Sequence, residues 1–123
     1  MNHLSRESLL EMRAAAINNM VAEAATNAAE KGWDEKPVTP GEQIALMHSE
    51  LSEALEDIRN GLPVYEMHYE EDGKPCGVPS ELADVIIRIG HFCGKYGINL
   101  GEAINVKMAY NATRPHRHGG KVL

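Results

Sequence analysis

The sequence predicts an all-α fold of the four-helix-bundle type, and three observations lead to this prediction. The chain has 123 residues, which is the size of one domain with one core. Aromatic residues make up only 5% of it and hydrophobic residues 43%, and Ala, Leu, Ile and Met, which favour helices over sheets, are prominent. Apolar side chains also recur at steps of three and four. We therefore expect one all-α domain over residues 1–123, with a long loop or small hairpin between its second and third helices.

Caps and periodicity indicate the first two helices. The first is expected over about residues 5–31, and its alanine-rich stripe would let another helix approach closely. The second begins with Thr39 as N-cap, Pro40 at the first helical position and Glu42 at the third, which together form a capping box. It is expected to end at Gly61. The apolar stripe expected to face the core consists of Ile44, Met47, Leu51, Leu55 and Ile58.

The second half of the chain contains a long loop and two further helices. Residues 62–79 are rich in Gly and Pro, with a hairpin expected to turn at Asp72-Gly73. Ser80 is expected to cap a third helix that ends at about residue 96, and a fourth helix follows to about residue 112. On the third helix, the residues expected to face the core are Leu82, Val85, Ile86, Ile89 and Phe92.

Charge and composition argue against several classes of protein. Lys and Arg number 12 against 18 Asp and Glu, a net charge of −6, whereas a nucleic-acid-binding protein would present a basic surface. The N-terminus lacks the apolar run of a signal peptide, and no apolar stretch approaches the ~20 residues of a membrane span. Cys76 and Cys93 are too few for a disulfide framework. We therefore expect a cytoplasmic protein with neither nucleic-acid nor membrane partners.

Two pairs of carboxylates on the second and third helices point to a metal site. Glu50 and Glu53 form one pair, and Glu81 and Asp84 form the other, each three residues apart beside an apolar stripe. A single such pair is usually a solvated helix face. Four carboxylates that converge where two helices pack would repel strongly unless cations neutralised them. Hard oxygen ligands suit Mg²⁺ or Mn²⁺ and not zinc, so we expect these four acids to bind such ions.

The fourth helix carries a row of polar residues that could bind phosphate. Lys107, Asn111 and Arg114 stand four and three residues apart and therefore share one face. Alone, such a row is a solvated edge near a helix C-terminus, where cations are favoured. Next to a cluster of metal-binding carboxylates, the same row would be a phosphate clamp.

Two further residues have both a structural and a functional interpretation. Arg88 lies on the polar stripe of the third helix and can pair with Glu81 or Asp84 within that helix, or contact a phosphate. Trp33, the only tryptophan, precedes the second helix. It either packs at the end of the first helix or stacks on a nucleobase.

Three segments resemble the MazG-like all-α nucleoside triphosphate pyrophosphohydrolases: EQIALMHSELSEALEDIRNG, KPCGVPSELADVIIRIGHF and NVKMAYNATRPHRHGGK. The family signature is ExxE, a spacer of about a dozen to under thirty residues, and ExxD. Here it reads Glu50-x-x-Glu53, 27 residues and Glu81-x-x-Asp84. The resemblance covers about residues 30–121, although Cys76 stands where relatives often have Glu. It implies a helical bundle assembled as a dimer or tetramer, with Mg²⁺ held by the four acids.

The resemblance also implies an activity and roles for individual residues. The reaction is hydrolysis between the α and β phosphates, which gives a nucleoside monophosphate and pyrophosphate. A triphosphate beside four carboxylates requires two or three divalent cations per site, with Glu53 as the catalytic residue that orients the attacking water. Lys107 and Arg114 would stabilise the pyrophosphate leaving group. The substrate-binding set comprises Lys107, Asn111, Arg114, Arg88, Trp33 and Lys121.

No feature of the sequence identifies the base or the sugar of the substrate. Analogy with small, often phage-borne relatives favours dGTP or GTP and the cytoplasm of a bacterial or phage-infected cell. Two alternatives remain open at this point. One is a dUTP- or dCTP-selective pyrophosphatase of the related all-α type. The other is a non-catalytic helical module that acts in oligomerisation or regulation.

Overall fold

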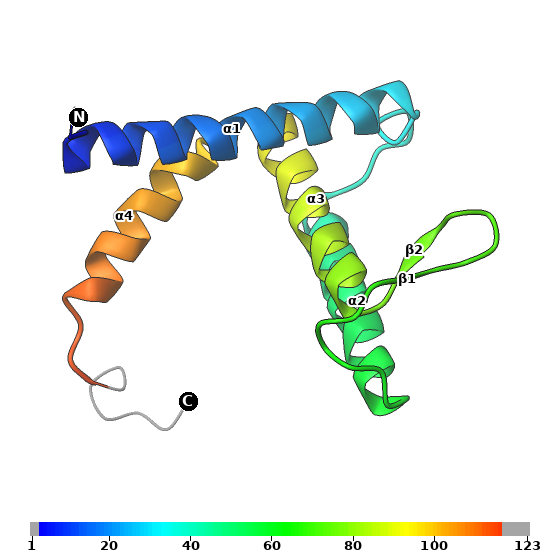
Figure 1. Cartoon of the computed structure of the whole chain (residues 1–123). Coiled ribbons are helices and arrows are strands. Elements are labelled where there is room, and N and C mark those ends of the chain that lie inside the picture. Colours follow the sequence, from blue (N-terminus) through cyan, green and yellow to red (C-terminus); the bar gives the residue numbers. More distant parts are fainter. Residues whose placement is uncertain (1–2, 117–123) are drawn as a thin grey trace.

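The computed structural model describes residues 3–116, which form four helices and one short hairpin (Figure 1). The all-α class and the hairpin between the second and third helices are therefore confirmed. No described helix is both long enough and apolar enough to cross a membrane. The elements are α1 (Arg6–Glu30), α2 (Pro40–Arg59), β1 (His68–Tyr69), β2 (Pro75–Cys76), α3 (Val78–Tyr96) and α4 (Leu100–Ala112).

Local capping accounts for most of the helix boundaries. The capping box at the start of α2 is present, because Thr39 Oγ1 accepts a hydrogen bond from the backbone N–H of Glu42 and the Glu42 carboxylate accepts one from Thr39 N–H. Helix α3 ends at Gly97, whose φ of +67° is a left-handed conformation that a residue without Cβ adopts at little cost.

The prediction that Ser80 caps α3 is wrong. Gly77 is in the N-cap position and the helix begins at Val78, three residues earlier than a Ser80 cap would place it. Pro79 occupies its first turn, where a missing N–H costs no helical hydrogen bond. Ser80 is buried inside this turn, and its hydroxyl donates to the backbone carbonyl of Pro75 at 3.2 Å. The serine therefore ties α3 to the hairpin.

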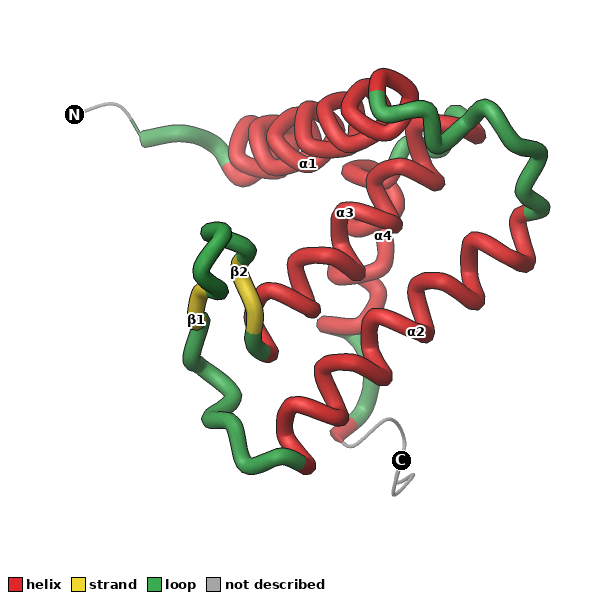
Figure 2. Tube along the Cα trace, turned by 90° about the vertical axis from the view of Figure 1, so that its right-hand side faces the viewer, coloured by secondary structure: helices red, strands yellow, loops and turns green. Residues whose placement is uncertain are grey.

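Helix α1 is the element on which the others are arranged. Both α3 and α4 pack against it, and α2 packs against α3 (Figures 1 and 2). The small side chains of α1 meet glycines of its neighbours: a Cβ added at Gly90 would lie 3.0 Å from Ala24 Cβ, and one at Gly94 would collide with Ala25. The close helix contact expected from the alanine-rich stripe is thus confirmed.

Polar side chains attach α4 to α1. The Asn105 carboxamide accepts a hydrogen bond from Arg13 Nε at 2.8 Å and donates one to the Leu10 carbonyl at 2.9 Å. Near the start of α4, Asn18 Oδ1 accepts from the Gly101 backbone N–H at 2.9 Å. Helix α4 is therefore oriented by α1, and in Figure 1 it diverges from α2 and α3.

The faces that α2 and α3 bury differ from those expected. On α2 the stripe centred on Leu51 is exposed, with Leu51 and Leu55 retaining 46% and 56% of their accessible surface, and on α3 Ile86 retains 51%. Most of the predicted core face is therefore wrong; the expected residues that are exposed are Ile44, Leu51, Leu55, Ile58, Leu82 and Ile86. The buried positions of α2 are instead Gln43, Glu50 and Ala54. Periodicity locates an apolar face on a helix but does not say whether the same chain covers it.

Candidate metal centre and adjoining pocket

Three of the four predicted metal ligands converge where α2 packs on α3. Glu50 and Glu53 stand one turn apart on α2 and meet Glu81 in the first turn of α3. One carboxylate oxygen from each lies within 4.8 Å of the other two. Glu50 is buried, Glu81 is half-buried and Glu53 is exposed, so the cluster has a covered inner side and an outer side open to solvent.

The electrostatics of the cluster centre on Glu81. Its Oε2 is buried and has no hydrogen-bond partner among the described residues. Burial, followed by the close contacts with Glu53 and Glu50, raises the pKa of Glu81 from 4.5 to about 7. At neutral pH this carboxyl group is therefore poised between binding a proton and carrying a charge that its neighbours oppose.

The fourth acid, Asp84, lies near the cluster but is not part of it. It stands one turn after Glu81 on α3, is exposed, and is not among the acids whose oxygens converge in the described chain. Burial of part of the side chain and the charge of Glu50 raise the pKa of Asp84, while Arg88 lowers it. The spacing of the signature thus brings three carboxylates together and leaves the fourth at the rim.

Arg88 of α3 pairs with a carboxylate of α2, a contact that the sequence did not predict. Its Nε donates to Glu50 Oε1 at 2.9 Å, across the α2–α3 contact. Of the two interpretations of Arg88, the ion pair within α3 to Glu81 or Asp84 is wrong, because this partly buried arginine pairs with the buried carboxylate of the facing helix. The guanidinium carbon also lies 5.5 Å from the centroid of the Trp33 ring.

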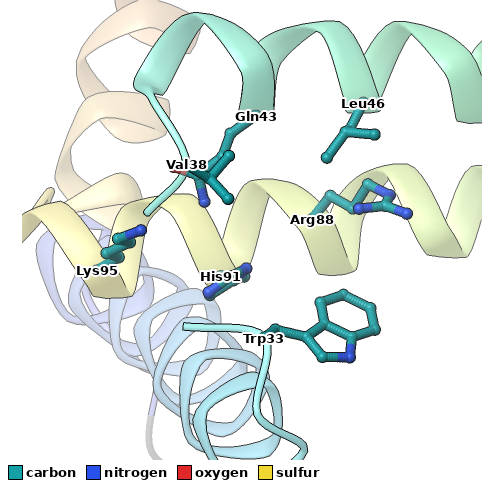
Figure 3. Close-up of a pocket in the computed structure, with 7 residues that line it drawn as sticks. All are labelled: Trp33, Val38, Gln43, Leu46, Arg88, His91 and Lys95. Atoms are coloured by element: carbon teal, nitrogen blue, oxygen red, sulfur yellow. The ribbon is translucent and has the colours of Figure 1, made fainter. Parts of the chain in front are cut away.

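A pocket of about 250 Å³ opens beside Arg88, between α2, α3 and the segment that joins α1 to α2 (Figure 3). Trp33, which is half-exposed, forms one wall, and its ring meets the His91 ring edge-to-face at 6.1 Å. Trp33 is connected to the acidic cluster through Arg88, which contacts both the Trp33 ring and Glu50. The residues that line the pocket are Trp33, Val38, Gln43, Leu46, Arg88, His91 and Lys95.

Sequence reasoning missed Gln43 and the polar pair behind Trp33. His91 Nε2 and Asp34 Oδ1 lie 2.8 Å apart, and Lys95 Nζ lies 4.0 Å from the same oxygen, so α3 holds the segment that carries Trp33. Gln43 is 7% exposed. A signal for Gln43 existed, because it stands seven residues before Glu50 and therefore shares its helix face.

The basic row of α4 does not reach the acidic cluster within one chain. Lys107, Asn111 and Arg114 are all exposed, and the Lys107 ammonium lies 5.4 Å from the Tyr110 ring centroid. Helix α4 packs on α1 and diverges from α2 (Figure 1), and the ion pairs found among residues 3–116 include none between this row and the carboxylates. Lys121 lies outside the described residues.

Comparisons of the chain with protein-family models, with curated proteins and with solved structures find no match. The function must therefore be argued from the side chains of the site. Those side chains combine a carboxylate cluster with an aromatic-walled pocket, and Arg88 touches both.

Proposed function

We propose that this protein hydrolyses a nucleoside triphosphate to the nucleoside monophosphate and pyrophosphate with the help of Mg²⁺ or Mn²⁺. The observation that carries the proposal is the convergence of Glu50, Glu53 and Glu81 next to the pocket walled by Trp33. A cluster of carboxylates alone is often only a solvated surface. Here Arg88 joins the cluster to a cavity of about 250 Å³, and Glu81 Oε2 of the cluster is buried without a hydrogen-bond partner in the part of the chain that the structure describes. The MazG-like signature independently suggests the same chemistry.

The donor set fits a hard divalent cation. Oxygen ligands of one octahedral Mg²⁺ are about 2.9 Å apart at adjacent positions and about 4.2 Å apart at opposite positions. The three carboxylate oxygens, which lie within 4.8 Å of one another, would therefore move closer together when they bind one ion. Glu50, Glu53 and Glu81 would hold the ions, and Asp84 would add a fourth carboxylate from the rim. Bound divalent cations would supply the positive charge that lets a polyphosphate approach carboxylates that otherwise repel it.

The pocket and the cluster would bind different parts of the substrate. Trp33 offers an aromatic face on which a nucleobase can stack, and the phosphates would then lie toward the carboxylates. Arg88 stands between the two regions and has further N–H groups besides the one bound to Glu50. It would therefore contact a phosphate oxygen of the bound nucleotide.

The reaction itself is an in-line displacement at the α-phosphorus. The oxygen of a water molecule forms the new bond to this phosphorus, and the bond from phosphorus to the oxygen bridging the α and β phosphates breaks. Pyrophosphate leaves with the electron pair, and the water loses a proton. Glu53 is the exposed member of the cluster, so its carboxylate is the one accessible to orient that water and accept its proton.

We also propose that the protein acts as a homo-oligomer, either a dimer or a tetramer. The apolar side chains Leu51 and Leu55 of α2 and Ile86 of α3 are roughly half exposed, and exposed apolar side chains that gather on one surface are typical of protein contacts. A second copy that covers these side chains could bring its own Lys107 and Arg114 toward the carboxylates, where they would stabilise the pyrophosphate leaving group. Such exposed apolar side chains are also what a non-catalytic oligomerisation module would have.

One experiment separates these functions. The protein is incubated with each ribo- and deoxyribonucleoside triphosphate and Mg²⁺, and monophosphate and pyrophosphate are quantified, with EDTA as the blank. We expect hydrolysis of at least one nucleotide, its loss in Glu53→Gln, and its retention in the matched control Glu56→Gln, which changes an exposed acid of α2 outside the cluster. Oligomers that split no nucleotide would instead identify the non-catalytic module, and full activity of Glu53→Gln would refute its catalytic role.

A further inference from the structure

We propose that Gln43 determines the base preference of this site, and that it selects a base with a lactam edge, which is a ring N–H next to a carbonyl. This inference rests on the function proposed above. It assigns a role to a residue that neither the carboxylate signature nor the aromatic wall explains.

Gln43 is an unsatisfied polar residue at a buried position. Only 7% of its surface is exposed, and its Oε1 is buried without a hydrogen-bond partner among residues 3–116. Figure 3 shows its side chain extending from α2 toward α3 in the pocket. Because a buried acceptor without a partner destabilises a protein, its presence in a cavity calls for a partner from outside the chain.

Two donor atoms of side chains that line the pocket with Gln43 are bound to acids. Arg88 Nε is bound to Glu50, and His91 Nε2 is bound to Asp34. The Gln43 oxygen is therefore available to accept an N–H from a ligand.

Lys95 is a second hydrogen-bond donor at this end of the pocket, and it would favour bases with a lactam edge over bases with an amino group beside a ring nitrogen. Lys95 Nζ is 4.0 Å from its acidic neighbour, Asp34, and Figure 3 shows Lys95 at the end of the pocket where Gln43 lies. A carbonyl oxygen has two lone pairs and can accept from both Gln43 Nε2 and Lys95, while the adjacent ring N–H donates to Gln43 Oε1. A ring nitrogen has one lone pair and can satisfy only one of these donors. Guanine, uracil and thymine have the first kind of edge, whereas adenine and cytosine present an amino group beside a ring nitrogen.

The distance along α2 from Gln43 to the carboxylates also suits a nucleotide whose base edge binds at Gln43. Gln43 precedes Glu50 by seven residues, or about 10 Å along the helix axis. Arg88 and Trp33 line the same pocket, and the guanidinium of Arg88 lies against the Trp33 ring. A base edge at Gln43 therefore leaves room for the base and the sugar before the phosphates reach the carboxylates.

The test uses Trp33 as its probe, since it is the only tryptophan of the chain and lies in the pocket. Quenching of its fluorescence is measured with GMP, UMP, AMP and CMP in the presence of Mg²⁺. We expect GMP and UMP to bind more tightly than AMP and CMP. Gln43→Met, which keeps the shape but removes the polar group, should weaken GMP and UMP about 5- to 100-fold, the range for leaving a buried N–H unpaired. AMP and CMP should change little.

Thermal melting separates recognition from packing. Gln43→Met should melt at the same or a higher temperature because the unsatisfied acceptor is gone, and the control His48→Met, at an exposed site on α2, should keep the binding preference. A lower melting temperature with equal weakening of all four nucleotides would mean that Gln43 only packs, and tighter binding of AMP or CMP by the wild type would refute lactam selection.

Hydrolysis measured in parallel distinguishes this inference from the proposed function. If no triphosphate is hydrolysed but binding of GMP or UMP depends on Gln43, the recognition role holds and the proposed reaction fails. If triphosphates are hydrolysed and Gln43→Met has the same KM as the wild type for each nucleotide, the proposed reaction holds and the role of Gln43 is refuted.

Discussion

Replacing Glu81 by Gln should stabilise the metal-free protein at pH 8 and leave it unchanged at pH 5. The folded protein binds the Glu81 proton more tightly than the unfolded chain, with a pKa of about 7 against 4.5, because the side chain is partly buried and faces Glu53 and Glu50. Where the native state binds more protons than the unfolded state, the free energy of unfolding falls as pH rises. The free energy of unfolding of the wild type should thus fall as pH rises from about 4.5 to 7. In the variant, the glutamine side chain does not ionise, so this fall should be absent.

The size of the effect follows from the same shift. Each pKa unit corresponds to about 1.4 kcal/mol, so the shift of Glu81 sets an upper limit of about 3.4 kcal/mol. Solvent reaches the outer side of the cluster through exposed Glu53 and screens the charges, which lowers the expected gain to about 1–2 kcal/mol. For a chain of this length, that gain raises the melting temperature by about 3–8 °C.

The assay is thermal unfolding of both proteins at pH 5 and pH 8, at equal protein concentration, with and without millimolar Mg²⁺ or Mn²⁺. Divalent metal should raise the melting temperature of the wild type by mass action and raise that of Glu81→Gln less, because the variant has lost one ligand. Glu56→Gln is the matched control and should show neither effect. A Glu81→Gln variant that is destabilised at pH 8, or that responds to metal as the wild type does, would refute the carboxylate crowding on which the metal site depends.

Three further predictions test separate parts of the structure. Arg88→Ala should lower catalytic efficiency by about 1.5–3 kcal/mol, the contribution of a hydrogen bond to a charged group, and unchanged steady-state kinetics would remove Arg88 from the site. Light scattering at micromolar concentration should show at least a dimer, and Leu55→Glu on the exposed stripe should shift it toward monomer; a monomeric wild type would contradict the oligomer. Gly94→Val should destabilise the protein by about 1–3 kcal/mol or more in denaturant titrations, because a Cβ there collides with Ala25 of α1, and equal stability would show that the helices separate readily.

The contacts indicate which variants should change nucleotide binding and which should change the reaction. Asp34 and His91 hold the segment that carries Trp33 against α3, and Arg88 connects the pocket to Glu50. A change at His91 should therefore affect nucleotide binding through the position of Trp33, whereas a change at Glu53 should act mainly on the reaction, through metal binding and the orientation of the water. Comparing KM with kcat for the two kinds of variant would separate these contributions.

Local interactions made much of the secondary structure predictable. The capping box of Thr39 and Glu42 and the left-handed Gly97 depend on residues adjacent in the chain, so the boundaries that they define could be read directly. The carboxylate pairs were recognisable for a similar reason, since a three-residue spacing places two side chains on one helix face whatever surrounds it. Ser80 was misassigned because Val78 and Pro79 extend the helix beyond the first polar residue that could cap it.

The pairing of helix faces depended on long-range contacts. Periodicity showed that α2 has an apolar stripe, but the face that α2 turns to α3 is the polar one with Gln43 and Glu50, where Arg88 of α3 pairs with Glu50. The Arg88–Glu50 pair spans 38 positions in sequence, and the Asp34–His91 pair spans 57, so no local pattern could indicate them. The sequence alone therefore determined the helices and the acids they carry, whereas the rotation of each helix about its axis, which decides what the acids face, was set by packing between distant segments.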